Sequence, residues 1–196
     1  MGIIKWLIGE KFPVTDKDHH IFTVQDSEKT VTRDLYDLLK MESPPADVLW
    51  LLGDIFYKGR FDVSRDEARG LYYYHKAADI GDEEAQYLLG LHYSDINIAK
   101  SVHYLRLAAQ QNHGDAQWQL AYTYLAYLDK YPKKILAAMQ LFCRSHLQGN
   151  KNAAEQLEKM IEVDKGIDDS GDMKRIIKRT LNELKKGQKP MFGNDW

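Results

Sequence analysis

The chain has 196 residues, with 27 Lys and Arg against 29 Asp and Glu, and a formal net charge of −2. This near-neutral balance argues against general nucleic-acid binding, which needs a strongly basic surface. The hydrophobic fraction of 44% is that of a folded globular protein, and a single cysteine excludes both an internal disulfide and a cysteine-rich zinc site. The length suits one compact domain or one short repeat array.

The chain begins with a short apolar run, residues 2–9, which Lys5 interrupts. The run is about half as long as a transmembrane helix needs to be, and it lacks the small-residue cleavage site of a secretory signal. We expect it to fold onto the body of the protein, with an interfacial anchor as the alternative. On this basis we predict a cytoplasmic protein with no membrane span.

Two small elements are predicted before residue 45. Residues 21–24 are mostly β-branched or aromatic and favour a short strand. Residues 28–41 predict an amphipathic helix, whose apolar stripe is Val31, Leu35, Leu38 and Leu39. The run 43–45, Ser-Pro-Pro, ends this segment.

The middle of the chain contains a repeating pattern, small-x-x-x-Leu-small-x-x-aromatic. It begins at Val48, Ala85 and Ala116 and fades at Ala153, so that the offsets are 37, 31 and 37 residues. This spacing places the residues on one helical stripe, and the small residue beside Leu lets a partner helix approach closely. The pattern predicts a first helix in each repeat, near 47–58, 84–94, 115–127 and 152–162.

A second pattern lies between the first ones and ends at Gly81, Asn112 and Gly149. Gly and Asn adopt the left-handed conformation at low cost, so we predict that these three residues end helices. The second helices are expected near 66–80, 98–111 and 133–148. Because one helix pair cannot bury its own apolar face, the pairs must stack on one another.

Residues 57–66, Tyr73–Gly81 and Ala85–Gly90 together resemble the Sel1-like repeat, a relative of the tetratricopeptide repeats. The resemblance is strongest over 46–92 and fades toward 162. It implies an all-α fold, a right-handed α/α superhelical solenoid of about three to four helix-turn-helix repeats with capping segments at both ends. We accordingly divide the chain into an N-terminal segment with a capping helix, the repeat array, and a C-terminal capping helix with a tail, at 1–44, 45–162 and 163–196.

Superposing the repeats on Gly53, Gly90 and Ala121 identifies first-helix positions that face away from the partner helix. In the tetratricopeptide arrangement such positions line the concave groove, and one row here is aromatic in every repeat. The predicted partner-binding residues are Trp50, Asp54, Tyr57, Tyr87, Leu91, Trp118 and Tyr122, with an acidic rim of Asp47, Glu84 and Asp115. Trp and Tyr are frequent binding hot spots. Alternatively, the aromatic row packs between successive repeats, and the acids are there because the first turn of a helix favours negative charge.

Nothing in the sequence carries a recognisable catalytic or cofactor-binding motif. The seven His residues lack metal-ligand spacing, so we predict no metal and no cofactor. Cys143 occupies the repeat position of His75 and Arg106, which predicts a partly exposed, ordinary thiol. An enzyme would have to use Asp47, Asp54 and Glu84 in a closed cleft.

The family resemblance implies an adaptor, regulator or inhibitor, and some small bacterial members act as immunity proteins. We therefore predict a non-enzymatic protein–protein interaction module that holds a partner protein or peptide in its concave groove. The alternative is an immunity protein that neutralises a bacterial toxin or effector. If the acidic rim takes part, the partner segment should be basic and apolar. The basic stretch 174–189 is either a solvated capping face or a contact for an acidic partner or anionic lipid.

Overall fold

A computed structural model describes residues 21–26, 29–127, 129–130 and 134–162, together with the single positions 179, 182, 183 and 186. The chain divides into two compact units, Met1–Leu89 and Gly90–Trp196, and each is described by itself. The interpretations made above for the first 20 residues and for most of 163–196 lie outside the described residues.

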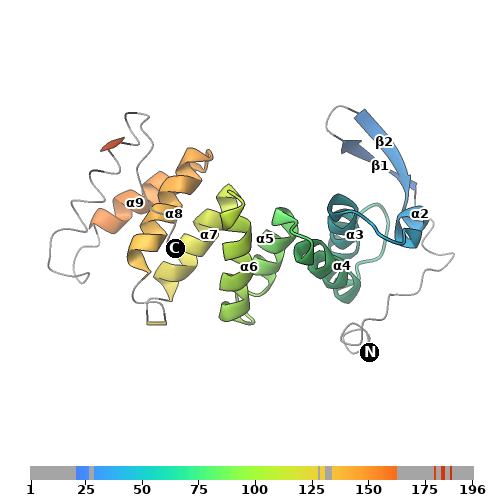
Figure 1. Cartoon of the computed structure of the whole chain (residues 1–196), viewed down its shortest axis with the longest axis horizontal. Helices are drawn as coiled ribbons and strands as arrows, with labels where there is room; N and C mark the ends of the chain where they lie inside the picture. Colours follow the sequence, from blue (N-terminus) through green and yellow to red (C-terminus); the bar gives the residue numbers. More distant parts are fainter. Residues whose placement is uncertain are drawn as a thin grey trace. The chain divides into compact units, whose positions relative to one another are not determined.

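Unit 1 opens with a two-stranded hairpin and a short helix (Figure 1). Strands β1 (Ile21–Asp26) and β2 (Lys29–Asp34) pair antiparallel, from Ile21 opposite Asp34 to Asp26 opposite Lys29. The predicted strand is thus confirmed. The predicted helix over 28–41 is wrong in its first half, because α2 spans only Leu35–Lys40. Its start is fixed by Asp34, whose side chain accepts a hydrogen bond of 2.9 Å from the backbone N–H of Tyr36.

The remaining described helices follow as pairs joined by short connections. In unit 1 they are α3 (Ala46–Lys58), α4 (Glu67–Asp79) and the first part of α5 (Glu83–His92). In unit 2 they are α6 (Ile98–Gln110), α7 (Gly114–Ala126), α8 (Ile135–Leu147) and α9 (Lys151–Glu162). Helix α3 packs on α4, and α7 packs between α6 and α8, which also contacts α9. The prediction of an all-α fold of stacked helix pairs, consistent with an α/α solenoid, is confirmed.

Each second helix ends in the same left-handed turn. Gly81, Asn112 and Gly149 have φ values of 98°, 68° and 95°, as the sequence pattern predicts. In every case the following N–H reaches back five residues, as from Asp82 to the Ala77 carbonyl at 3.0 Å. This bond and its inner companion satisfy carbonyls that the helix end would leave open. In unit 2 this turn brings α7 back against α6 and α9 back against α8.

The small residues of the first-helix pattern lie where two helices cross closely. A Cβ atom at Gly90 would come within 2.6 Å of the Leu105 side chain in unit 2. The leucines beside these small residues form the core: Leu52 and Leu89 in unit 1 and Leu120 in unit 2 are 0% exposed. The small residue of the repeat pattern thus allows the close helix crossing, and the leucine beside it contributes to the buried core.

Candidate partner-binding surface

The aromatic row of unit 2 contains one exposed stacked pair on α7. The rings of Trp118 and Tyr122 lie 5.5 Å apart between centroids and are nearly parallel, at 10°. Tyr122 is 48% exposed, and Trp118 is half-buried. The Trp118 indole N–H is covered and has no hydrogen-bond partner among the described residues. Leu91, which the sequence assigns to the same surface, is half-buried on α5.

The aromatic row of unit 1 is made by Trp50 on α3 and Tyr87 on α5, and both are half-buried. The Trp50 indole N–H, like that of its repeat counterpart Trp118, is covered and lacks a hydrogen-bond partner among the described residues. Buried indole N–H groups in native proteins are usually bonded. Because both rings are half-buried, this row is neither fully interior nor fully open to solvent.

Asp54 does not lie on this surface, although the sequence assigns it there. Its side chain is 0% exposed and accepts a 3.3 Å hydrogen bond from the Tyr74 hydroxyl. It also forms ion pairs with Lys58 and, at 2.9 Å, with Arg60. Because Gly53 has no side chain, the Tyr74 ring comes close to α3, and its hydroxyl reaches the neighbouring carboxylate. Asp54 therefore ties α3, α4 and their connection together.

Tyr57 also contacts neighbours inside unit 1, but unlike Asp54 it is only half-buried. Its ring lies 5.6 Å from that of Tyr74, and the Arg65 guanidinium lies 5.8 Å from its centroid. Burial raises the pKa of the Tyr57 hydroxyl, and the nearby Glu67 carboxylate adds to the effect. The half-buried phenol thus helps to hold the connection between α3 and α4.

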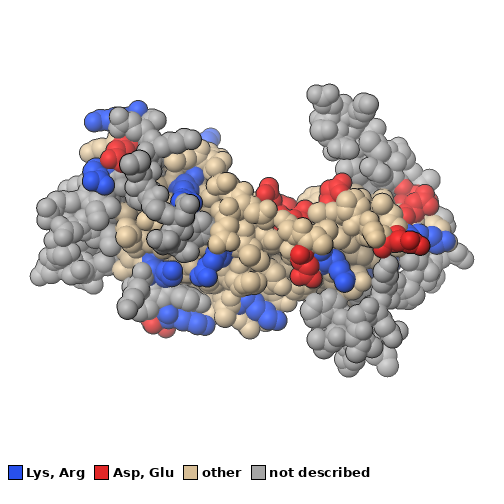
Figure 2. Space-filling model, in the orientation of Figure 1, with Lys and Arg blue, Asp and Glu red and all other residues tan. Residues whose placement is uncertain are grey.

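The acidic rim is brought together in unit 1. Burial raises the pKa of the Asp82 carboxyl, and the charges of Glu84, Glu83 and Asp47 raise it further. Asp47 on α3 and the two glutamates at the start of α5 therefore lie near the same carboxyl group, that of Asp82. Figure 2 shows acidic side chains gathered over this part of the molecule. In unit 2, Asp115 is exposed and accepts a 3.1 Å hydrogen bond from the Asn150 side chain.

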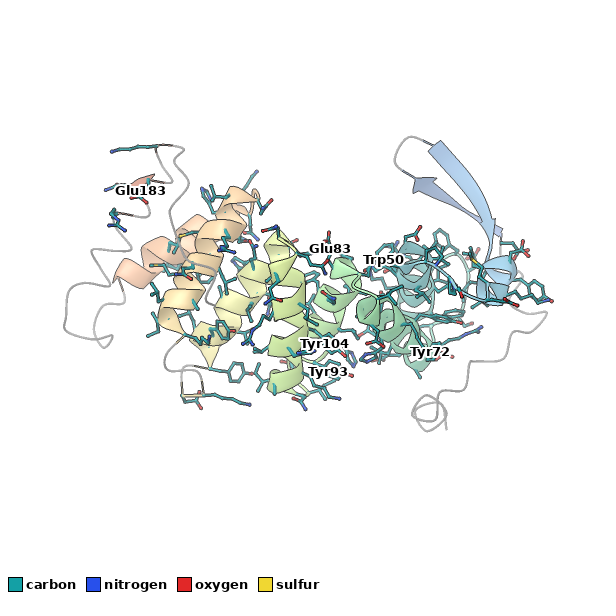
Figure 3. All side chains as sticks on the ribbon, in the orientation of Figure 1. Trp50, Tyr72, Glu83, Tyr93, Tyr104 and Glu183 are labelled. Atoms are coloured by element: carbon teal, nitrogen blue, oxygen red, sulfur yellow. The ribbon has the colours of Figure 1, made fainter. Side chains whose placement is uncertain are left out.

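The sequence interpretation missed a second set of aromatic contacts, between first and second helices. Phe56 stacks on Tyr73 at 5.9 Å and 18°. Tyr93 stacks on Tyr104 at 5.9 Å and 12°, and Figure 3 labels both of these residues. Both pairs occupy equivalent repeat positions. The signal was present as two aromatic columns at the same offsets, and it encodes packing within a helix pair.

Cys143 is another correction, because it is 0% exposed instead of partly exposed. Burial raises the pKa of its thiol to about 12. His75 and Arg106 at the equivalent positions are both half-buried. Helix α9 packs on α8 at the end of the described array, and the small thiol tolerates burial there.

The described residues contain neither a metal-type cluster of side chains nor a helix that could span a membrane. Nowhere among them do three or more His, Cys, Asp or Glu side chains gather as they would around a metal ion. No helix within the described ranges is long and apolar enough to cross a membrane. Asp54 is one of the three acids that an enzyme would have to use, and its carboxylate already forms ion pairs with Lys58 and Arg60.

Paired helices, repeated left-handed turns and a small residue that recurs at the helix crossing define an α/α helical-repeat protein. A family model described as the Sel1 repeat matches three consecutive segments, 46–82, 83–113 and 114–150, which make up more than half of the chain. The chain belongs to the Sel1 repeat family. Modules of this family are typically protein-interaction scaffolds, and the match identifies no catalytic family. No curated protein matches the sequence.

Two solved structures share the fold. A Sel1 repeat protein from Oxalobacter formigenes has 23% sequence identity and a TM-score of 0.56, over 71% of this chain and 58% of that one. The second is c5321, described as a protective antigen of uropathogenic Escherichia coli strains with an SLR fold. It also has 23% identity, with a TM-score of 0.55 over 70% of this chain and 30% of that one. The chain thus spans less than two thirds of either protein.

Proposed function

We propose that this chain is a non-catalytic protein–protein interaction module, an adaptor or regulator, whose first-helix faces hold a partner protein. In unit 1 the proposed residues are Trp50, Tyr57 and Tyr87, and in unit 2 they are Leu91, Trp118 and Tyr122. Asp54 is left out because a carboxylate that is 0% exposed cannot touch a partner. In tetratricopeptide-like arrays these positions belong to the concave wall, and we keep that assignment for the first-helix face of each unit.

The observation that carries the proposal is the Trp118–Tyr122 stack. The two large rings stack on each other, yet Tyr122 stays 48% exposed. Apolar aromatic surface is therefore left in contact with water instead of being packed in a core. Such rings provide apolar area with few rotatable bonds and a polar tip, which is why they recur as hot spots of protein interfaces. The stack is therefore ready to be covered by a partner.

The test uses capture of a partner from host lysate by the full-length chain, followed by its identification, purification and calorimetric titration. Tyr122→Ser should weaken binding at least about tenfold, as expected for the loss of a hot spot. Leu136→Ser removes another exposed apolar side chain of unit 2, 40% exposed on α8, and should change the affinity less than about twofold. If the two variants weaken binding equally, the α7 face is not the site.

The identity and stoichiometry of the captured protein separate the two forms of this function. An immunity protein should form a tight one-to-one complex with a toxin over a large buried area. An adaptor should bind shorter segments of several proteins more weakly. The bacterial origin of the two similar structures is compatible with either form.

A further inference from the structure

The surface of unit 1 around Trp50 combines an indole ring with several carboxylates. We call this surface the acidic–aromatic face and define it by Asp47, Trp50, Glu83 and Glu84. Asp47 lies one turn before Trp50 on α3, and both glutamates lie in the first turn of α5. In Figure 3, Trp50 and Glu83 lie along the same edge of unit 1.

The three carboxylates of this face all lie near Asp82. The charges of Glu84, Glu83 and Asp47 together help to raise the pKa of Asp82, which itself caps α5 by accepting a 2.7 Å bond from the Ala85 N–H. Asp47 and Glu83 are exposed, and neither has an ion-pair partner among the described residues. The negative charges of Asp47 and Glu83 are therefore not balanced by an ion pair with any described residue.

The Trp50 ring also differs from several other described aromatic rings of unit 1, which lie under a cation of the same unit. Arg69 lies 4.0 Å from the centroid of Phe56, Arg65 lies 5.8 Å from that of Tyr57, and Lys76 lies 5.9 Å from that of Tyr72. No Lys or Arg among the described residues lies over Trp50, although indole is the ring that attracts cations most strongly. Among the described rings of unit 1, the only indole is thus left to a cation from outside.

We propose that the acidic–aromatic face binds an arginine or lysine side chain of a basic segment in the partner protein. The cation lies over the Trp50 ring, and the carboxylates of Asp47 and Glu83 balance its charge. This inference rests on the proposed function and names the chemistry of one part of the partner. Arginine fits best, because its planar guanidinium stacks on an indole and donates to two carboxylates at once.

The probe is a short amidated peptide of alternating Arg and Leu, titrated into the full-length chain at physiological salt. Binding is followed by NMR through the Trp50 indole N–H signal, which is assigned by its loss in Trp50→Phe. The Arg-Leu peptide should shift this signal, whereas the matching Glu-Leu peptide should leave it in place. A Trp50 signal that does not move with the Arg-Leu peptide overturns the inference.

Two charge reversals provide the matched comparison. Asp47→Lys and Asp37→Lys each change the net charge equally, and each replaces an exposed acid in the first turn of a helix of unit 1. Asp47→Lys should weaken peptide binding about tenfold, whereas Asp37→Lys should weaken it less than about twofold. Equal weakening would mean that only the overall field attracts the peptide, and would also overturn the inference.

The two proposals fail in different ways. If the captured partner depends on Tyr122 but is insensitive to Asp47→Lys, the interaction function stands and the cation site is wrong. If the Arg-Leu peptide binds as expected but the partner ignores both Tyr122→Ser and Asp47→Lys, the cation site exists, and the proposed partner surface is wrong.

Discussion

The Tyr74 ring lies in the space that a side chain at Gly53 would occupy. A Cβ atom at Gly53 would come within 2.4 Å of Cδ1 of Tyr74, whose side chain is only 2% exposed. The crossing of α3 and α4 is therefore set by the absence of a side chain at one position and the presence of a large ring at the other.

Gly53→Ala should destabilise the protein by about 1–3 kcal/mol, because the buried ring cannot move aside without strain. The sign of the effect is diagnostic. Without the close crossing, the same change within a helix would stabilise by about 1 kcal/mol through helix propensity. Denaturant unfolding followed by circular dichroism measures the difference, and an increase in stability would contradict the packing described for α3 and α4.

Tyr74 also makes stability depend on pH in alkali. Burial raises the pKa of its hydroxyl above the ordinary value of 10.0, and the charge and hydrogen bond of Asp54 raise it further. The unfolded chain loses this proton near pH 10, whereas the folded protein keeps it. The contribution of Tyr74 is therefore complete below about pH 10 and is lost as the pH rises above that value.

The test is thermal unfolding of wild type and Tyr74→Phe from pH 8 to 12. We expect a shallower loss of melting temperature above pH 10 in the variant, because phenylalanine has no proton to lose. Tyr57, Tyr72 and Tyr93 also have raised pKa values, so some alkaline loss should remain in both proteins. Parallel pH profiles would show that Tyr74 is not a source of the effect.

The connection between α3 and α4 contains two consecutive left-handed residues that are not glycine, Phe61 and Asp62, with φ values of 56° and 61°. This conformation crowds the Cβ of an L-residue, and glycine adopts it without that cost. Because Asp62 is exposed, Asp62→Gly should stabilise the protein by about 0.5–1 kcal/mol. Chemical denaturation measures the change.

Asp66 provides the control, four residues further along the same connection. Its side chain caps α4 by accepting a 3.0 Å hydrogen bond from the Arg69 N–H. Asp66→Ala should therefore destabilise by about 0.5–2 kcal/mol. If both substitutions destabilise, the backbone at Asp62 carries no relievable strain.

The helices of the array could be predicted closely because local chemistry repeats in them. Asn112 takes the left-handed conformation of its glycine counterparts. Because Gly and Asn adopt this conformation most easily, their recurrence at one repeat position predicts the turn. The secondary structure of the segment before the array was harder to predict, because its helical stripe of apolar residues overlaps with β-branched residues that favour a strand. Strand β2 takes the first half, and the cap by Asp34 starts the helix only at Leu35.

The candidate surface could be predicted only as a set of helix positions. Helical periodicity places Asp54 in line with Asp47 and Trp50, yet Asp54 is buried because its partners come from α4 and from the loop after α3. Such partners are fixed by tertiary packing and leave no periodic signal. At the repeat positions equivalent to Asp54 the chain has Leu91 and Tyr122, which carry no carboxylate for such partners to bind. Leu91 is half-buried and Tyr122 is exposed.

Cys143 allows the packing at the end of the array to be tested chemically. With a thiol pKa of about 12, only about one molecule in ten thousand carries the reactive thiolate at pH 8, compared with about a quarter for an ordinary exposed cysteine. Alkylation of the native protein by iodoacetamide should therefore be at least about a thousandfold slower than that of an exposed thiol.

The reference is Leu147→Cys in a Cys143→Ser background, because Leu147 is 44% exposed on the same helix. Labelling in denaturant should make the two proteins equally reactive, which shows that folding is the cause of the difference. If Cys143 in the native protein reacts within about tenfold of the reference, the thiol is not buried as described, since an exposed thiol would have its ordinary pKa of about 8.5.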